Sequence, residues 1–129
     1  MSATVAPVTR TITQQQLSAY ADASGDHNPI HVDEEFARGT MFGGTIAHGM
    51  LVLALIGEMM FAAHGEAWAS RGKLKVRFKA PARPGDTITA SAQLTREDAG
   101  SRNVEYAVQC VNAAGETVIE GRASVGAAS

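Results

Sequence analysis

The sequence predicts an α+β fold in which a curved antiparallel β-sheet wraps around a long central helix. Residues 46–64 form an apolar stretch rich in Met, Leu and Ala, and no polar side chain interrupts it between Met50 and Ile56. Such a stretch favours a helix that the rest of the fold covers on all sides. Beyond it, apolar and polar residues alternate in four segments, as in strands with one buried face. That face needs a cover, and the helix can supply it.

The composition is that of one soluble domain. We expect residues 1–129 to form a single domain, because 129 residues can bury an adequate core without a metal or a disulfide. Eleven basic and thirteen acidic residues give a net charge of -2, which argues against a nucleic-acid partner. Glu58 ends an apolar run far shorter than the roughly 20 residues of a bilayer span, so no membrane partner is expected. The lone cysteine and an N-terminus without a secretory signal indicate the cytoplasm, and no Cys or His spacing indicates a metal site.

Short elements precede the central helix. Thr13 and Gln16 have the spacing of a capping box, which marks the start of a helix. The expected order is a short strand at residues 8–13, a helix ending near Ser24, a loop at 24–31, a second short helix at 33–37 and a loop at 39–45.

The alternating segments after the helix predict four strands. They cover residues 73–80, 87–94, 104–110 and 117–125, with turns at 81–86, 100–101 and 112–115. Short links between alternating strands favour three consecutive hairpins, and hence an antiparallel meander. Cys110 falls on the apolar face of the third strand, so we expect it to be a small core residue.

The loop at 24–31 holds the candidate chemistry. Asp26, Asn28 and His31 lie within six residues of each other, in a turn that Pro29 stiffens. A carboxylate beside an imidazole forms a general acid/base pair, and the amide can hold a water molecule. The alternative is that Asp26 caps a turn, Asn28 makes an Asx turn before Pro29, and His31 is an ordinary surface histidine. Gly49 begins the apolar helix, where backbone N–H groups without intrahelical partners can stabilise a developing oxyanion.

These motifs carry a family resemblance. The run Tyr20-Ala21-x-x-Ser24-Gly25-Asp26-x-Asn28-Pro29-Ile30-His31, followed by His48-Gly49-Met50, resembles the signature of the MaoC-like, (R)-specific enoyl-CoA hydratases, which have the hot-dog fold. Residues 78–86 resemble the second strand of that family and its exit turn.

The resemblance implies reversible syn addition of water across the 2,3 double bond of a trans-2-enoyl thioester. Asp26 and His31 match the catalytic pair, with Asn28 beside them, and Gly49 matches the backbone donor to the thioester oxygen. Which member of the pair takes the proton from water is left open. No metal or redox cofactor is implied, and coenzyme A enters only as part of the substrate. Where some members carry a serine further along the helix, this chain has Gly57.

The resemblance also implies a homodimer, or a larger homo-oligomer, whose sheets join edge to edge with a substrate tunnel at the interface. The substrate is an acyl-CoA or an acyl-carrier thioester. Candidate substrate-binding residues are His48 and Met50 at the helix start, and Lys79 and Arg83 for the phosphates of coenzyme A. Lys79 belongs to a basic row with Arg71, Lys73, Lys75 and Arg77, which alternatively serves solubility and edge protection.

Two other functions remain open at this level. The first is a hot-dog acyl-CoA thioesterase, in which Glu58 on the central helix activates water for attack on the carbonyl carbon. The second is a non-catalytic subunit that binds acyl thioesters. The presence of two titratable groups in one turn favours catalysis over binding alone.

Overall fold

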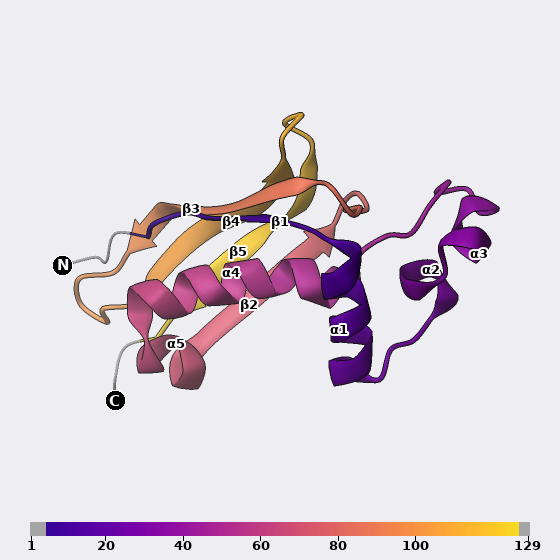
Figure 1. Ribbon diagram of the computed structural model, residues 1–129. Coiled ribbons are helices and arrows are strands. Elements are labelled where there is room, and N and C mark those ends of the chain that lie inside the picture. Colours follow the sequence, from indigo (N-terminus) through magenta and orange to yellow (C-terminus); the bar gives the residue numbers. More distant parts are fainter. Residues whose placement is uncertain (1–4, 127–129) are drawn as a thin grey trace.

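The computed structural model describes residues 5–126, in which a five-stranded antiparallel sheet curves over one long helix (Figure 1). The predicted α+β architecture is confirmed. In chain order the elements are β1 (Val8–Thr11), α1 (Gln14–Ser24), α2 (Pro29–Val32), α3 (Glu34–Arg38), α4 (Gly49–His64), α5 (Glu66–Arg71), β2 (Gly72–Phe78), β3 (Thr87–Glu97), β4 (Val104–Asn112) and β5 (Thr117–Val125).

The predicted helix starts are confirmed at atomic level. The Thr13 hydroxyl accepts a hydrogen bond from Gln16 N at 3.1 Å, and the Gln16 side chain accepts one from Thr13 N at 3.2 Å. This capping box begins α1, which ends at Gly25 in the left-handed conformation, with φ of 82°. Asp33 caps α3 by accepting a bond from Phe36 N at 3.0 Å.

Two short helices lie where the sequence did not predict them. Residues 24–31 were expected to be loop throughout, but α2 begins at Pro29, because Asn28 caps it and the fixed φ of proline suits a first helical position. The link after the central helix contains α5, whose six residues are too few for a periodic pattern to reveal.

The order of the strands differs from the predicted meander. The sheet runs β1-β3-β4-β5-β2, so β2 pairs with β5 at the far edge and not with β3. Only two of the three expected hairpins exist among the described residues, β3 to β4 and β4 to β5. The segment at 79–86 has to cross three strand spacings, about 14 Å, which its eight residues reach easily but a tight hairpin would not.

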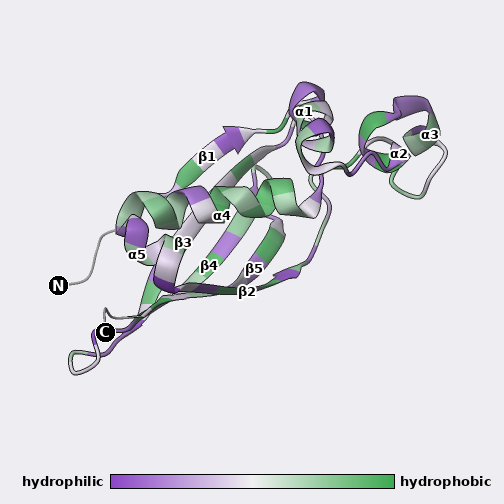
Figure 2. Ribbon diagram, turned by 90° about the horizontal axis from the view of Figure 1, so that it is seen from below, coloured by the Kyte–Doolittle hydropathy of each residue, from purple (hydrophilic) through white to green (hydrophobic). Residues whose placement is uncertain are grey.

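The core lies between α4 and the concave face of the sheet. Val52, Ile56 and Met59 of the helix are buried in one cluster with Ile88, Tyr106, Val108, Cys110 and Ile119 of the strands. Burial raises the pKa of the Cys110 thiol to about 11, so it is a protonated core residue, as expected. Figure 2 shows that hydrophobic residues fill most of α4 where it crosses the sheet.

The expectation that the helix is covered on all sides is wrong for this chain alone. α4 packs mainly on β1, β3 and β4, and Phe61 on its other side is 54% exposed. The physical reason is that one curved sheet can cover only one side of a helix. Within residues 5–126, no helix has the length and apolarity needed to cross a membrane. The single-domain expectation stays a prediction, and residues 1–4 and 127–129 lie outside the described part.

Candidate active site

An arm made of α1, α2 and α3 stands at the end of the sheet where α4 begins (Figure 1). A network of side-chain hydrogen bonds holds the arm to the loop that enters α4. The buried Thr45 hydroxyl lies 2.7 Å from Gln14 Oε1 and 3.1 Å from Glu34 Oε2, and the Gln14 amide donates to the His31 carbonyl at 2.9 Å. These contacts tie α1 and α3 to the loop before α4, and α2 to α1.

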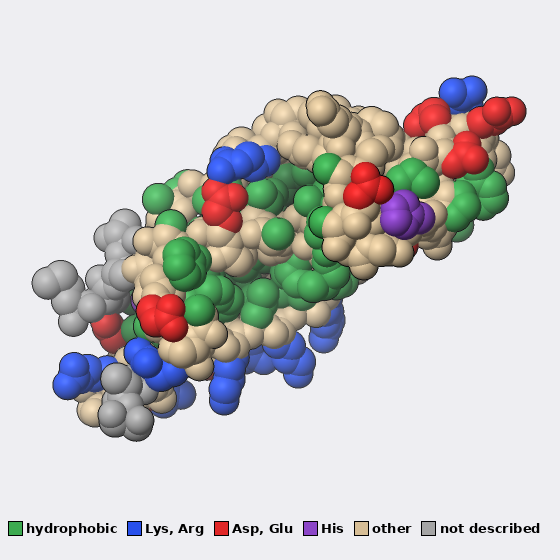
Figure 3. Space-filling model, turned by 60° about the horizontal axis from the view of Figure 1, so that its bottom comes forward, with side chains coloured by type: hydrophobic (Ala, Val, Ile, Leu, Met, Phe, Trp, Pro, Cys, Tyr) green, Lys and Arg blue, Asp and Glu red, His purple; other side chains and the backbone are tan. Residues whose placement is uncertain are grey.

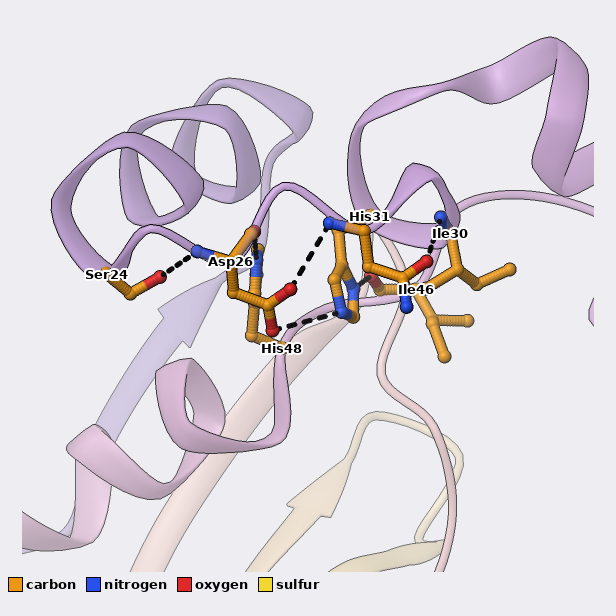
Figure 4. Close-up of polar contacts among 7 residues, drawn as sticks. Ser24, Asp26, Ile30, His31, Ile46 and His48 are labelled. Carbon is orange, nitrogen blue, oxygen red and sulfur yellow. Dashed lines mark hydrogen bonds and ion pairs between the residues drawn. The ribbon is translucent and has the colours of Figure 1, made fainter.

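Asp26 and His31 face each other across the turn, as the sequence predicted (Figure 4). Asp26 Oδ2 lies 3.9 Å from His31 Nε2, and the side chains are 54% and 12% exposed, respectively. His31 Nδ1 lies 2.7 Å from the Ile46 carbonyl, which only accepts, so Nδ1 carries a proton and Nε2 is the nitrogen turned to the carboxylate. A distance of 3.9 Å lets one substrate oxygen contact both groups.

Asn28 lies beside the pair, but its side-chain oxygen has a structural contact. Asn28 Oδ1 accepts a hydrogen bond from Ile30 N at 3.1 Å and so caps the helix that carries His31. In turn, Asp26 Oδ1 accepts from Asn28 N at 3.2 Å. The turn is therefore held by its own polar groups, and the catalytic role expected for Asn28 stays a prediction.

His48 lies behind the pair and contacts both members of it. Its Nε2 is 3.0 Å from the Asp26 carbonyl, and its ring stacks on the His31 ring with centroids 3.8 Å apart and an interplanar angle of 23°. Tyr20 of α1 approaches the His48 ring at a centroid distance of 4.8 Å. The His48 residue is only 3% exposed, so little of its surface is open to a substrate.

Gly49, the next residue, begins α4 and borders an apolar hollow of about 330 Å³. The lining residues are Phe42, Ile46, Ala47, Gly49, Val52, Phe78, Lys79, Ala80, Pro81, Ala82, Val118 and Ile119. Leu51 N and Val52 N donate to the His48 carbonyl at the first turn. The N–H of Gly49 precedes them and has no carbonyl within the helix to bond, so it can donate to a ligand.

Phe78 forms one wall of this hollow. A Cβ atom on Gly49 would lie 2.9 Å from the Phe78 ring, so glycine lets the ring approach the start of the helix. The Phe78 side chain is half-exposed at the end of β2, beside the hollow. No pattern in the sequence indicates this contact, which joins residues 29 positions apart.

The donor atoms of Asp26, His31 and His48 all lie within 4.8 Å of one another, a spacing that metal sites also show. The two imidazole rings, however, stack almost parallel, so their in-plane lone pairs run side by side and do not meet at one point. His48 Nε2 and His31 Nδ1 are also engaged with backbone carbonyls. This donor set does not fit a tetrahedral metal ion.

The remaining candidate residues are Met50, Lys79 and Arg83. Met50 is 58% exposed on the first turn of α4, and Lys79 lines the hollow while pairing with Glu120 at 3.5 Å. The Arg83 guanidinium donates to the Phe42 carbonyl and thereby ties the 79–86 segment to the loop before α4. Substrate contacts of these residues stay predictions.

Glu58, the alternative catalytic carboxylate, forms an ion pair with Arg10 of β1. Glu58 lies nine positions beyond Gly49, which is about 13.5 Å along a helix at 1.5 Å per residue. A water molecule activated by Glu58 would therefore lie far from a thioester carbonyl bound at Gly49.

A second pair of titratable residues lies at the other end of α4. His64 Nε2 is 2.8 Å from the Tyr106 hydroxyl. Burial lowers the pKa of His64, and burial together with the charge of Glu97 raises the pKa of Tyr106. Both groups are therefore favoured in their neutral forms.

Comparison with known proteins identifies the family of the chain. Residues 2–115 match the family described as MaoC like domain. The chain belongs to this family. Among the relatives of this MaoC-like protein, a 3-hydroxyacyl-thioester dehydratase Z of Mycobacterium tuberculosis is 43% identical over 103 residues, which are 76% of this chain and 68% of the relative. An (R)-specific enoyl-CoA hydratase of Rhodospirillum rubrum is 36% identical over 120 residues, 93% of this chain and 83% of the relative.

Solved structures give the same result for the fold of the MaoC-like chain. An R-hydratase of Pseudomonas aeruginosa in its unliganded form superposes with a TM-score of 0.79 at 30% identity, covering 98% of this chain and 81% of that one. The (R)-hydratase of A. caviae gives a TM-score of 0.85 at 24% identity, covering 99% and 97%, and supports the fold alone. The predicted family, the hot-dog fold and the enzyme class, a hydro-lyase, are confirmed.

Proposed function

We propose that this protein catalyses the reversible, (R)-specific hydration of trans-2-enoyl thioesters to (R)-3-hydroxyacyl thioesters. The observation that carries the proposal is the approach of Asp26 Oδ2 to His31 Nε2, beside the helix start at Gly49. The names of the relatives, which are hydratases and dehydratases of acyl thioesters, support the reaction class and the stereochemistry.

The chemistry follows from these positions. The oxygen of a water molecule between the pair forms a bond to C3, while one member of the pair removes a proton from that water. The π electrons move to C2 and the carbonyl oxygen, where charge accumulates, and the other member returns a proton to C2. Because the Ile46 carbonyl holds the Nδ1 proton, Nε2 is the atom of His31 that exchanges protons. The two groups must start in complementary protonation states, and each addition exchanges those states. One proton therefore returns from the group that took it to the group that gave one, directly or through a water molecule between Asp26 Oδ2 and His31 Nε2, before the next turnover.

The amide of Gly49 is suited to the charge on the thioester oxygen. It lies at the positive end of a helix of 16 residues, and its rigid backbone needs no reorganisation during the reaction. The loss of one such donor in other enzymes costs about 10²- to 10³-fold in rate. The hollow beside Gly49 is mostly apolar, as the carbon chain of the substrate requires.

Substitution of the pair tests the proposal. Asp26→Asn and His31→Ala should each lower kcat for hydration of crotonyl-CoA by at least about 10²-fold, because each removes one proton-transfer group. Asp26→Asn keeps the side-chain oxygen that accepts the bond from Asn28 N, so the turn should remain folded. The rate is followed by the loss of enoyl-thioester absorbance, with circular dichroism as the control for folding. Near-normal turnover by either folded variant would refute the assignment.

The same assay separates hydration from thioester hydrolysis. Hydration consumes the enoyl group without releasing a thiol, whereas a thioesterase releases free coenzyme A. The ion pair between Glu58 and Arg10, and the distance from Glu58 to Gly49 along the helix, argue against hydrolysis. Binding without turnover would leave the absorbance unchanged and would support the non-catalytic alternative.

We infer that the active form is a homodimer or a larger homo-oligomer. Figure 3 shows hydrophobic side chains gathered on the face that carries α4, with Lys and Arg along its lower rim. Residues on α4 and β2 that are not fully covered include Leu53, Phe61, Leu74, Val76 and Phe78. The edge strand β2 offers unpaired backbone groups beside them, so a second copy could extend the sheet and cover this face.

The remaining features of the proposal concern the substrate and the compartment. Lys79 at the hollow, with Arg83 on the segment that follows it, is suited to the phosphates of coenzyme A or of an acyl carrier. The reaction as written needs no metal and no redox cofactor. A chain with one cysteine, buried in the core, suits the reducing cytoplasm in which we expect the enzyme to act.

A further inference from the structure

We propose that His48 is a positioning residue, which fixes Asp26 and His31 relative to each other and to the Gly49 amide. The inference rests on the proposed function, since it names the residue that aligns the proton-transfer pair with the oxyanion donor. His48 was expected to bind substrate, but its ring is nearly fully covered and its contacts are to the pair itself.

The first contact fixes the carboxylate-bearing turn. The Asp26 carbonyl oxygen can only accept, so the 3.0 Å contact is a hydrogen bond donated by the Nε2–H of His48. On its other side, the Asp26 N–H donates to the Ser24 hydroxyl at 3.2 Å. Because the Asp26 side chain is half-exposed, these two bonds to the Asp26 backbone fix the position from which the carboxylate extends. Figure 4 shows both bonds and the His48 ring beside Asp26.

The second contact fixes the imidazole. The His48 ring lies 3.8 Å from the His31 ring and nearly parallel to it, so it limits movement of His31 perpendicular to the ring plane. Within that plane, the Ile46 carbonyl already holds Nδ1. Tyr20 approaches His48 as well, at 4.8 Å and an interplanar angle of 59°. The His48 ring thus connects α1 and α2 to the start of α4.

The covalent structure adds the third partner. His48 is bonded to Gly49, the first residue of α4, so the ring that orders the pair is attached to the amide that faces the thioester oxygen. A misplacement of about 1 Å between reacting groups can cost on the order of 10²-fold in rate. A single anchor for all three groups therefore controls their mutual distance.

The choice of histidine itself points to the hydrogen bond. His48 Nδ1 is buried and has no hydrogen-bond partner among residues 5–126, which costs desolvation free energy without return. A phenylalanine would stack on His31 without that cost. What histidine supplies in addition is the Nε2–H that holds the Asp26 carbonyl.

Three single variants test the inference with crotonyl-CoA as substrate. His48→Phe keeps an aromatic ring against His31 and removes the donor, whereas His48→Gln keeps an N–H donor and removes the ring. Each should lower kcat by about 10- to 100-fold while KM changes by less than about 3-fold, because the pair is misaligned and the binding surface is intact. The matched control is His27→Gln, an exposed histidine of the same turn that pairs with Asp22 and should leave both constants unchanged.

A double variant separates positioning from a merely structural role. If His48 acts through the pair, then adding His48→Phe to Asp26→Asn should lower kcat by less than about 3-fold further. Thermal melting at the assay pH confirms that each variant is folded. If His48→Phe does not fold, His48→Gln takes its place in the double variant. A raised KM with unchanged kcat, or a full additive loss in the double variant, would overturn the inference while the hydratase assignment stands. A wild-type protein inactive on enoyl thioesters would overturn the assignment and the inference together.

Discussion

Asn28 offers a test that separates helix capping from catalysis. Its Oδ1 accepts a hydrogen bond from Ile30 N at the start of α2, the helix of four residues that carries His31. Asn28→Ala removes that acceptor, whereas Asn28→Ser provides another of equal capping strength and adds no charge beside Asp26. Serine lacks the amide N–H groups through which Asn28 would hold the reacting water.

The expected magnitudes follow from the cap. Loss of an N-cap acceptor costs about 0.5–2 kcal/mol, and if all of this falls on the placement of His31, kcat/KM drops about 2- to 30-fold. Asn28→Ser should therefore stay within about 3-fold of the wild-type protein, while Asn28→Ala falls in the range above. A residue that takes part directly in proton transfer would cost about 10²- to 10⁴-fold instead.

The assay is steady-state hydration of crotonyl-CoA by the wild-type protein and both variants at one pH. A loss of about 10²-fold or more in both variants alike would refute the capping argument, and it would support the expectation that the amide holds water. Far-ultraviolet circular dichroism checks that α1 and α4, which do not depend on Asn28, are unchanged.

Three further substitutions test the packing of the sheet and the far end of α4. A Cβ atom on Gly121 would lie 2.1 Å from the Lys75 carbonyl oxygen in the neighbouring strand, and that backbone cannot yield. Gly121→Ala should lower the free energy of unfolding by about 2 kcal/mol or more in urea titrations. Gly126→Ala, whose nearest contact would be 3.8 Å, should change it by less than about 0.5 kcal/mol. Because burial lowers the pKa of His64, the folded state holds fewer protons than the unfolded state just below pH 6.5. The neutral His64 therefore contributes stability that is complete above pH 6.5 and is lost as the pH falls through the lowered pKa. His64→Gln should make the free energy of unfolding decline less steeply on acidification.

The stabilities of the alanine variants and the pH dependence of His64→Gln can each contradict the reasoning. Equal stability of the two alanine variants would mean that β2 is not held as close to Gly121 as the register with Val76 indicates. Parallel stability curves for the wild-type protein and His64→Gln between pH 5 and 7 would mean that His64 does not contribute to the acid sensitivity.

Much of the fold could be predicted because its elements have intrinsic periods. The apolar run from Met50 to Ile56 determined a helix, and alternation determined all four strands of the second half, with β5 at the predicted residues 117–125. The order of those strands was not predictable in this way. Short turns favour neighbours in sequence, but the pairing of β2 with β5 depends on how the whole sheet closes over α4.

The candidate site likewise has a part that the sequence predicted and a part that it did not. The spacing of Asp26 and His31 within one stiff turn made their approach predictable, since few backbone torsions separate them. The contacts of His48 with Asp26 and of Gly49 with Phe78 join residues 22 and 29 positions apart, and no local pattern encodes them.

The sequence by itself therefore determined the helix, the strands and the pair of proton-transfer groups, because each depends on neighbours along the chain. Only the tertiary structure decided the sheet order, the covered position of His48 and the uncovered face of α4. Those features arise when distant segments bury their apolar faces against one another, and that requires the whole chain at once.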